Sequence, residues 1–462
     1  MRTCCIVDEC PLCIKKNERT EMVTDVFYPK VLIVGHRPGE YTGVSITLKN
    51  LFHNWPSNKL FVAATGSEPT TLDDSDYSFY QLGRKEITSL WGSKDIVSAP
   101  LAEDELGSAR GNKPKRSIQL SFYTKLFKPL LIKTGLYSIR VKYTVSHELL
   151  AWIRDNEIDI IFTMLGNVSS MKFAINLKRS TGRKLAIFIL DDWIHSHPNQ
   201  ALFPFIWKHI YSGLFVQVVR LADIHMAISV KMSTEYEKEY CKAFHVFHNP
   251  VDMSIFEASS RHVHITQSSF KICYIGKVNG DTIDGLLDLI KALEILGDNR
   301  VLLDIYAGSN ANKIEAVMGR IDPLRNVRIM SYVSNDQIPN VVMASDLLYL
   351  PLGFSKQSRN YTRLSMPTKA SEYMASRVPI LLYAPDCIAL TEYAVKDEWA
   401  ITICDRNVDL LRKTIVDIMS GEIDTQKFVE NAFSLAVLKH QASAVRNDFR
   451  KALAKPCQTE SN

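Results

Sequence analysis

The sequence has little that would direct it into or across a membrane. No apolar run reaches the length of a membrane-spanning helix, and the first residues contain no apolar stretch of the kind found in secretion signals. Nine cysteines, an odd number without such a signal, indicate reduced thiols rather than a disulfide framework. We therefore expect a cytoplasmic protein.

The sequence also has no bias towards the residues that are typical of disordered or fibrous proteins. Hydrophobic residues make up 46% of the chain and charged residues 23%, and neither Gly nor Pro is enriched, which excludes a disordered or fibrous protein. The 462 residues are too many for one hydrophobic core, so the length predicts two domains.

Metal-binding patterns are scarce. Cys10 and Cys13 have the spacing of zinc ligands, but no second pair of cysteines or histidines follows at a usual distance. We interpret residues 1–29 as an N-terminal extension and expect no metal site.

Acidic residues are missing from residues 106–147, a segment that holds nine Lys or Arg with interleaved aromatic and aliphatic residues. A basic amphipathic segment of this kind is typical of contact with an anionic membrane surface. An ordinary core helix with a solvated basic face would give the same pattern. Nucleic acid is not expected as a partner, since no recognisable binding module accompanies the basic residues.

Short β-branched runs alternate with helical patterns along the chain. Residues 30–35, a helical stretch and residues 60–65 form a βαβ pattern, which predicts a parallel sheet with helices on its faces. The alternation restarts after residue 252, with a strand at 270–276 and an amphipathic helix at 285–296. We predict two successive Rossmann-like domains, at 30–252 and 253–430. The remaining residues, 431–462, are a helix and tail that pack back on the first domain.

Parallel α/β sheets bind ligands at the carboxyl ends of their strands. Gly43 lies in the loop after the first strand, where a glycine lets the backbone approach a ligand, although a plain βα turn explains this loop equally well. A second polar loop precedes a helix that begins near Thr368 and carries Lys369 and Glu372 in its first turns. Free amides at a helix N-terminus suit a diphosphate, and a carboxylate can accept hydrogen bonds from sugar hydroxyls. Lys369 and Glu372 could instead pair on a surface face, because they are three residues apart.

This second region resembles the family 4 retaining glycosyltransferases of the GT-B fold, particularly members from bacterial cell-surface polysaccharide synthesis. Their donor-binding run reads roughly Ser-Pro-x-Lys-x-x-Glu-Tyr-Met-Ala-x-Gly-x-Pro. The matching positions are Ser365, Pro367, Lys369, Glu372, Tyr373, Met374, Ala375 and Pro379. Weaker similarities follow in the family's order from about residue 30 to 450, including Gly43-Val-Ser45, His248-Asn-Pro-Val-Asp252 and Ala344-Ser-Asp346.

The resemblance implies two Rossmann-like domains facing across a cleft and a nucleotide-sugar donor, such as a UDP- or GDP-sugar, with no cofactor or metal. We expect the donor to be bound by Gly43, Lys277, Ser365, Pro367, Thr368, Lys369, Glu372 and Tyr373, with Lys277 standing where many members of the family have an arginine. The chain also departs from the family. Leu364 stands where many members have a first glutamate, Thr282 stands near an expected lysine, and Arg359 or Arg363 could supply the missing cation.

On the acceptor side, Asp191 and Asp192 follow a predicted buried strand, with His195 close behind. One of these groups could orient or deprotonate an acceptor hydroxyl, as could His36. Alternatively, one aspartate simply caps the next helix.

The sequence therefore predicts sugar transfer to a saccharide or polyprenyl-linked acceptor in cell-surface glycan synthesis, with retention implied by the resemblance alone. A sugar-nucleotide 2-epimerase of the same fold, or an inactive sugar-nucleotide-binding relative, are the alternatives.

Overall fold

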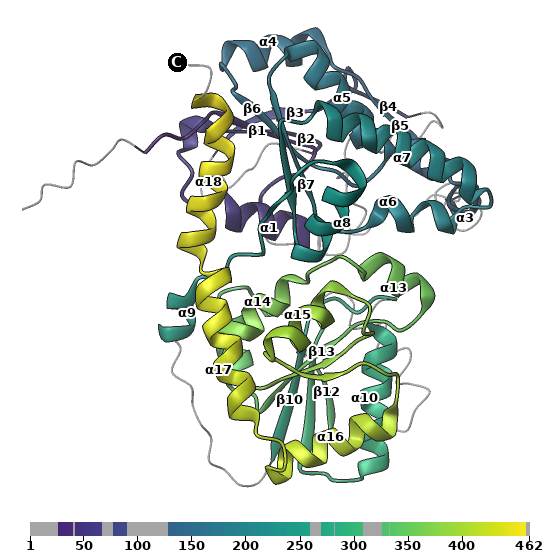
Figure 1. Ribbon diagram of the computed structural model, residues 1–462, viewed down its shortest axis with the longest axis vertical. Helices are drawn as coiled ribbons and strands as arrows, with labels where there is room; N and C mark the ends of the chain where they lie inside the picture. The colour runs from purple at the N-terminus through teal and green to yellow at the C-terminus, as the bar shows by residue number, and fades with distance from the viewer. Residues whose placement is uncertain are drawn as a thin grey trace, which may run out of the picture.

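The computed structural model consists of two α/β domains stacked one above the other (Figure 1). The structure describes residues 26–39, 42–66, 77–89, 128–258, 269–280, 282–307, 326–331 and 333–458.

The N-terminal domain is built on a seven-stranded sheet in the order β3-β2-β1-β6-β7-β8-β9, in which every neighbouring pair is parallel. Its strands are rich in β-branched residues and are largely buried on both faces, as expected of a parallel sheet covered by helices. They are β1 (Val31–Val34), β2 (Leu60–Ala64), β3 (Ser78–Gln81), β6 (Ile160–Met164), β7 (Lys184–Ile189), β8 (Ile224–Ala227) and β9 (His245–Val246).

Helices cover this sheet, and the domain also has a separate two-stranded antiparallel sheet. The helices are α1 (Gly43–Leu51), α3 (Lys128–Thr134), α4 (His147–Asp155), α5 (Val168–Thr181), α6 (Trp193–Ser196), α7 (Pro204–Leu221) and α8 (Val230–Tyr240). The antiparallel pair joins β4 (Ile87–Ser89) to β5 (Val141–Tyr143).

The C-terminal domain repeats the design with six parallel strands in the order β12-β11-β10-β13-β14-β15. The strands are β10 (Phe270–Ile275), β11 (Val301–Tyr306), β12 (Val327–Met330), β13 (Leu347–Pro351), β14 (Ile380–Tyr383) and β15 (Ile401–Ile403). Its helices are α10 (Ile283–Leu296), α12 (Ile338–Met343), α13 (Lys356–Thr362), α14 (Thr368–Ala375), α15 (Ala389–Asp397) and α16 (Val408–Ser420).

The strand order reverses beside the first strand of each sheet. β1 lies between β2 and β6, and β10 lies between β11 and β13. Such a reversal opens a crevice at the carboxyl ends of the strands, where doubly wound sheets bind their ligands. The predicted pair of Rossmann-like domains is therefore confirmed, and each domain contributes one such crevice.

The end of the chain crosses from one domain to the other. The sequence predicted a single helix and tail at 431–462, but the structure has α17 (Thr425–Leu435), a π-helical turn (Ala436–His440) and α18 (Ala442–Gln458). The break falls at the crossing point, where the amide of Val251 donates to the carbonyl of His440 (2.8 Å) and the amide of Ala442 to Val251 (2.9 Å). These ladder contacts replace the helical hydrogen bonds of a continuous helix.

Beyond the break, α18 packs on the N-terminal domain, as expected from the sequence (Figure 1). The fully buried ring of Phe449 meets Phe52, Phe162 and Phe247 edge to face, with ring centroids 5.1, 5.8 and 5.4 Å away. On the connection between the sheets, α9 (Met253–Ala258) begins at the predicted domain boundary, and residues 259–268 lie outside the described residues.

Candidate functional site

Lys369 lies at the crevice of the C-terminal sheet, directly over the end of β10. A Cβ atom on Gly276 would sit 2.3 Å from the Lys369 ammonium, so the lysine occupies the space that a side chain there would need. The φ of Gly276 is +145°, a conformation that L-residues rarely adopt. Nζ of Lys369 lies 3.3 Å from the Tyr274 hydroxyl and 4.5 Å from the centre of its ring. The strand end thus holds a cation at the position where strand order reverses.

Glu372 stands one turn further along α14. Among the described residues its carboxylate makes no hydrogen bond or ion pair, which excludes a surface pair with Lys369. Burial raises the pKa of Glu372 to about 7, and the charge of Lys369 only partly opposes this shift. Glu372 is half-buried, and a carboxyl group with a perturbed pKa and no hydrogen-bond partner at a strand end is typical of a ligand site.

The first turn of α14 leaves backbone donors available. Its N-cap is Pro367, which supplies no side-chain hydrogen bond, and within the described chain the amides of Thr368 and Lys369 have no acceptor. The amides and the helix dipole together favour an anion at this end. Tyr373 has a different position, in the core, where its hydroxyl accepts a hydrogen bond from the amide of Ile275 (3.1 Å) and ties α14 to β10.

Two other cations predicted for the donor site, Lys277 and Arg359, differ in their positions. Lys277 is exposed beside Gly276, on a loop held by the Tyr274 hydroxyl and by Thr282, which both donate to its carbonyl (2.7 and 3.1 Å). Arg359 is exposed and donates to the carbonyl of Phe354 (2.9 Å). Of these two, Lys277 directly follows Gly276, the residue against which Lys369 packs.

Asp191 and Ser365, predicted for the acceptor and donor sides, meet across the domain interface. The Ser365 hydroxyl donates to Oδ1 of Asp191 (2.6 Å), and the Tyr361 hydroxyl donates to Oδ2 (3.3 Å). The carboxyl ends of the two sheets therefore face each other, since Asp191 follows β7 and Ser365 precedes α14.

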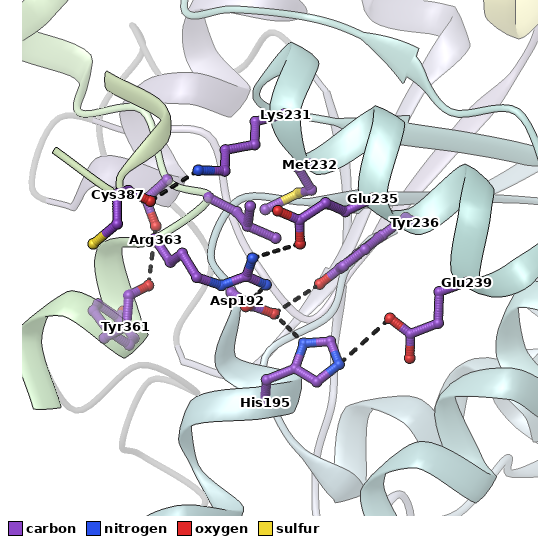
Figure 2. Close-up of polar contacts among 12 residues, drawn as sticks. Asp192, His195, Lys231, Met232, Glu235, Tyr236, Glu239, Tyr361, Arg363 and Cys387 are labelled. Carbon is purple, nitrogen blue, oxygen red and sulfur yellow. Dashed lines mark hydrogen bonds and ion pairs between the residues drawn. The ribbon is translucent and has the colours of Figure 1, made fainter. Parts of the chain in front are cut away.

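Asp192 is at the centre of a second cross-domain group (Figure 2). Its side chain is 0% exposed and accepts hydrogen bonds from Arg363 (2.8 Å) and Tyr236 (3.2 Å), while Nδ1 of His195 lies 2.6 Å away. Arg363 also pairs with Glu235. Asp192 occupies the N-cap position of α6 but makes no capping hydrogen bond, so the simple capping interpretation is wrong.

These contacts decide the charge states of the group. Burial alone would raise the pKa of Asp192, but the hydrogen bonds and charges of His195 and Arg363 bring it below its usual value. The hydrogen bond with Asp192 in turn raises the pKa of His195, against the effect of burial. Asp192 is therefore an ionised, fully satisfied anchor for an arginine from the other domain.

A cavity of about 280 Å³ lies at the crevice of the N-terminal sheet. Its polar lining includes His36 after β1, Thr163 on β6, Asn167 before α5, and His197 after α6. Burial lowers the pKa of both histidines to about 4, so both rings are neutral at pH 7. The ring of His197 stacks on Tyr361 of the other domain, with centroids 6.4 Å apart and planes 11° apart.

Gly43 is the first residue of α1, and a Cβ atom there would meet nothing within 4 Å. The packing of the protein itself therefore does not require a glycine at position 43.

Sequence reasoning did not find the contribution of His197 or the pairing of Arg363 with Asp192. The two residues of that pair are 171 positions apart, so only the fold brings them together. His197 is two residues from His195, but nothing in the local pattern separates a cavity-lining histidine from a surface one.

Two predictions fall wholly or largely outside the described residues: the Cys10–Cys13 pair and the basic segment from 106 to 127. Within the part of the chain that the structure describes, no three His, Cys, Asp or Glu side chains are grouped to hold a metal ion. Within the same part, no helix is long and apolar enough to cross a membrane.

Comparison with known proteins gives a family match for the C-terminal domain. Residues 269–420 match the family described as Glycosyl transferases group 1, which covers the whole second sheet and α14. No curated protein matches the chain.

Solved structures share the fold at low identity. HepE of Anabaena in complex with UDP is 13% identical, with a TM-score of 0.60 over 92% of this chain and 100% of that one. Sucrose-phosphate synthase from Thermosynechococcus elongatus is 10% identical, with a TM-score of 0.62 over 93% and 100%. The α,α-trehalose 6-phosphate synthase of Burkholderia multivorans is 12% identical, with a TM-score of 0.59 over 94% and 100%. The chain thus has the GT-B fold of these structures, and its second domain is similar to the group 1 glycosyltransferase family over residues 269–420.

Proposed function

We propose that this protein transfers a sugar from a nucleotide-sugar donor to a saccharide or polyprenyl-linked acceptor in cell-surface glycan synthesis. The observation that carries the proposal is the unpaired Glu372 carboxyl one turn from Lys369, on a helix whose first amides are available. The group 1 family match over the same residues supports it.

The donor would lie against α14. Its diphosphate fits the amides of Thr368 and Lys369, with the ammonium of Lys369 and the nearby Lys277 as counter-charges. Glu372 would accept hydrogen bonds from hydroxyls of the donor. As the glycosidic bond to the diphosphate breaks, the helix dipole and the lysines stabilise the developing negative charge without a metal ion.

The acceptor would enter the N-terminal cavity from the opposite side of the interface. His36 and His195 are the two candidates for accepting the proton of its hydroxyl. His36 lines the cavity in its neutral form, and His195 has a raised pKa beside Asp192. In this scheme Asp191 and Asp192 position the two domains, and the separate variants H36Q and H195Q identify the base.

The donor is a UDP- or GDP-sugar in this proposal, and the reaction retains the anomeric configuration. UDP-glucose is the first donor to test, because the related HepE fold was solved with UDP-glucose. The protein would act in the cytoplasm, with contact to an anionic membrane through the basic region 106–147.

The test is incubation with nucleotide sugars, with and without saccharide acceptors, followed by measurement of nucleoside diphosphate release. We expect turnover that survives chelation of metals and falls at least 100-fold in Glu372→Ala, while Glu422→Ala, a change of an exposed carboxylate in the same domain, leaves it intact. Formation of an epimer from donor alone would establish the epimerase instead. Unchanged turnover in Glu372→Ala would contradict the proposed site.

A further inference from the structure

The exposed apolar side chains of the N-terminal domain are concentrated where α3 meets the start of α7. Leu202, Phe203 and Phe205 are 61%, 54% and 69% exposed. Ile206 follows on α7, and Leu130 and Ile132 lie exposed on α3. We refer to these six residues as the α3/α7 surface. Scattered exposed apolar residues are ordinary in proteins, but a contiguous group of this size marks an interaction site.

Two specific contacts fix the parts of this surface against each other. The amide of Leu202 donates to the carbonyl of Lys133 (2.6 Å), and the indole of Trp207 donates to the carbonyl of Thr134 (2.9 Å). A Cβ atom on Gly135 would fall 2.1 Å from the Trp207 indole, and the φ of Gly135 is +79°. The apolar side chains are thus exposed on a packed framework and not on a loose end.

The charge around the α3/α7 surface has one sign. Residues 193–222 contain no Asp or Glu, and neither do residues 128–147, so the two segments that form the surface lack acidic side chains. Lys133, Lys208 and His209 are exposed among the apolar residues. Phe and Leu beside Lys, without carboxylates, are the side chains that enter the headgroup region of an anionic bilayer.

We propose that the α3/α7 surface docks the protein on an anionic lipid bilayer. A symmetric contact with a second copy is disfavoured, because it would bring the Lys133 and Lys208 side chains of both copies into one interface, and the two segments that form the surface supply no acidic partner. The surface is also next to the acceptor side of the interface. His197, which lines the N-terminal cavity, is only five residues before Leu202, and α6 separates α7 from α13 of the other domain (Figure 1).

A bilayer in this position would deliver a lipid-linked acceptor to the N-terminal cavity without its release into water. This last point rests on the proposed function, whereas bilayer docking itself does not require any transfer activity.

The experiment is sedimentation of the full chain with phosphatidylcholine vesicles that contain phosphatidylglycerol, and with vesicles of phosphatidylcholine alone. We expect binding to the anionic vesicles that weakens as salt is added, because the lysines interact with headgroups through screened charges. The double variant Phe203→Gln/Phe205→Gln, and separately Lys133→Gln/Lys208→Gln, should each lower the partition coefficient at least tenfold.

Matched changes on the other domain serve as controls. Ile295→Gln/Val395→Gln removes two apolar side chains of similar exposure (51% and 57%), and Lys291→Gln/Lys413→Gln removes two exposed lysines. These controls should bind vesicles as the unaltered protein does, and all variants should keep its melting temperature and its donor affinity.

Failure of the unaltered protein to bind anionic vesicles would overturn the proposal. Equal losses in the surface and control variants would overturn it as well. A dimer in light scattering that Phe203→Gln/Phe205→Gln dissociates, without any vesicle binding, would assign the surface to self-association instead. Vesicle binding without sugar transfer would leave docking intact and count against the proposed function alone.

Discussion

Two carboxylates at the carboxyl ends of the two sheets, the buried Asp192 and the half-buried Glu372, have opposite surroundings. Asp192, at the end of the N-terminal sheet, is surrounded by donors from His195, Tyr236 and Arg363 and is held ionised. Glu372, at the end of the C-terminal sheet, has no hydrogen-bond partner among the described residues, and its pKa rises to about 7. The difference separates a carboxylate that holds two domains together from one that is available to a ligand.

The two carboxylates also give stability opposite dependences on pH. Since the folded pKa of Asp192 is depressed, its contribution is present above the unfolded pKa and is lost as the pH falls. The folded pKa of Glu372 is raised, so stability is lost as the pH rises from 4.5 towards 7, where the unfolded chain has already released the proton. A ligand that uses the Glu372 carboxylate would recover part of that loss.

The largest expected effect follows removal of Asp192. Asp192→Ala leaves the Arg363 guanidinium and the Tyr236 hydroxyl without their buried partner, which should lower the free energy of unfolding by about 3–5 kcal/mol. Urea denaturation monitored by circular dichroism measures this. Glu235→Ala is the control, because Glu235 pairs with the same arginine but keeps 34% of its side chain exposed, and it should cost about 1 kcal/mol or less. Equal losses in the two variants would remove the distinction made for Asp192.

Glu372→Gln should separate stability from function. An amide of the same shape carries no charge to desolvate, so the variant should be about 1–3 kcal/mol more stable than the unaltered protein at pH 8. The gain should vanish near pH 4, where both side chains are neutral. Melting curves at the two pH values test this, and donor affinity should fall at the same time. A variant that loses stability at pH 8 would show that the Glu372 carboxylate is satisfied in the fold.

Replacement of Gly276 by alanine should lower stability more than replacement of Gly43, although both glycines follow the first strand of a sheet. Gly276→Ala forces a strained φ and displaces the Lys369 ammonium, with a loss of about 1–3 kcal/mol in stability. Gly43→Ala meets no protein atom and should leave stability unchanged. Thermal unfolding compares the two. If Gly43→Ala weakens donor binding at full stability, the predicted approach of the donor to Gly43 is supported.

The smallest expected effect on stability comes from a buried pair of histidines that does not form a ligand site. His248 and His440 pack with centroids 4.9 Å apart at the domain crossing, and Nδ1 of each lacks a hydrogen-bond partner in the described chain. Burial lowers their pKa values to about 4 and 3, so each should cost about 1 kcal/mol of stability when the pH falls to 5.5, because the unfolded chain binds the proton first. His248→Phe should flatten the decline in melting temperature between pH 6.5 and 5. An unaltered decline would show that this histidine is already protonated in the fold.

The histidine pair shows that a missing hydrogen bond does not by itself make a ligand site. His248 and His440 are enclosed, at 8% and 1% exposure, whereas Glu372 stands at a strand-end crevice beside a lysine and available amides. Glu372 is a candidate ligand site because it lies at the crevice where the strand order reverses, whereas the two histidines lie at the domain crossing.

The parts of the fold that depend on local pattern were predictable. The β-branched runs predicted β1, β2 and β10 within one or two residues, and the restart after 252 predicted the second domain. Lys369 and Glu372 could be found because they lie on one helix, three residues apart. The break at the end of the π-helical turn was missed, since it arises from the contact of Val251 with His440 and not from the amphipathic pattern.

Cross-domain contacts were out of reach for the same reason. Ser365 was predicted to touch the donor, but its hydroxyl donates to Asp191, 174 residues away. Tyr373 also belonged to the matching motif, yet its hydroxyl holds β10 from inside the core. A motif conveys which residues occur together, and only the fold distinguishes those that face the crevice from those that support it.

The central claim is that Lys369 and Glu372 hold the donor, and calorimetric titration with UDP and GDP tests it most directly. We predict that the unaltered protein binds at least one of them and that Lys369→Met weakens binding at least tenfold, as loss of a charge-assisted contact should. Lys356→Met, an exposed lysine on neighbouring α13, should bind as before. Absence of binding to the unaltered protein, or equal affinity in Lys369→Met, would contradict the claim.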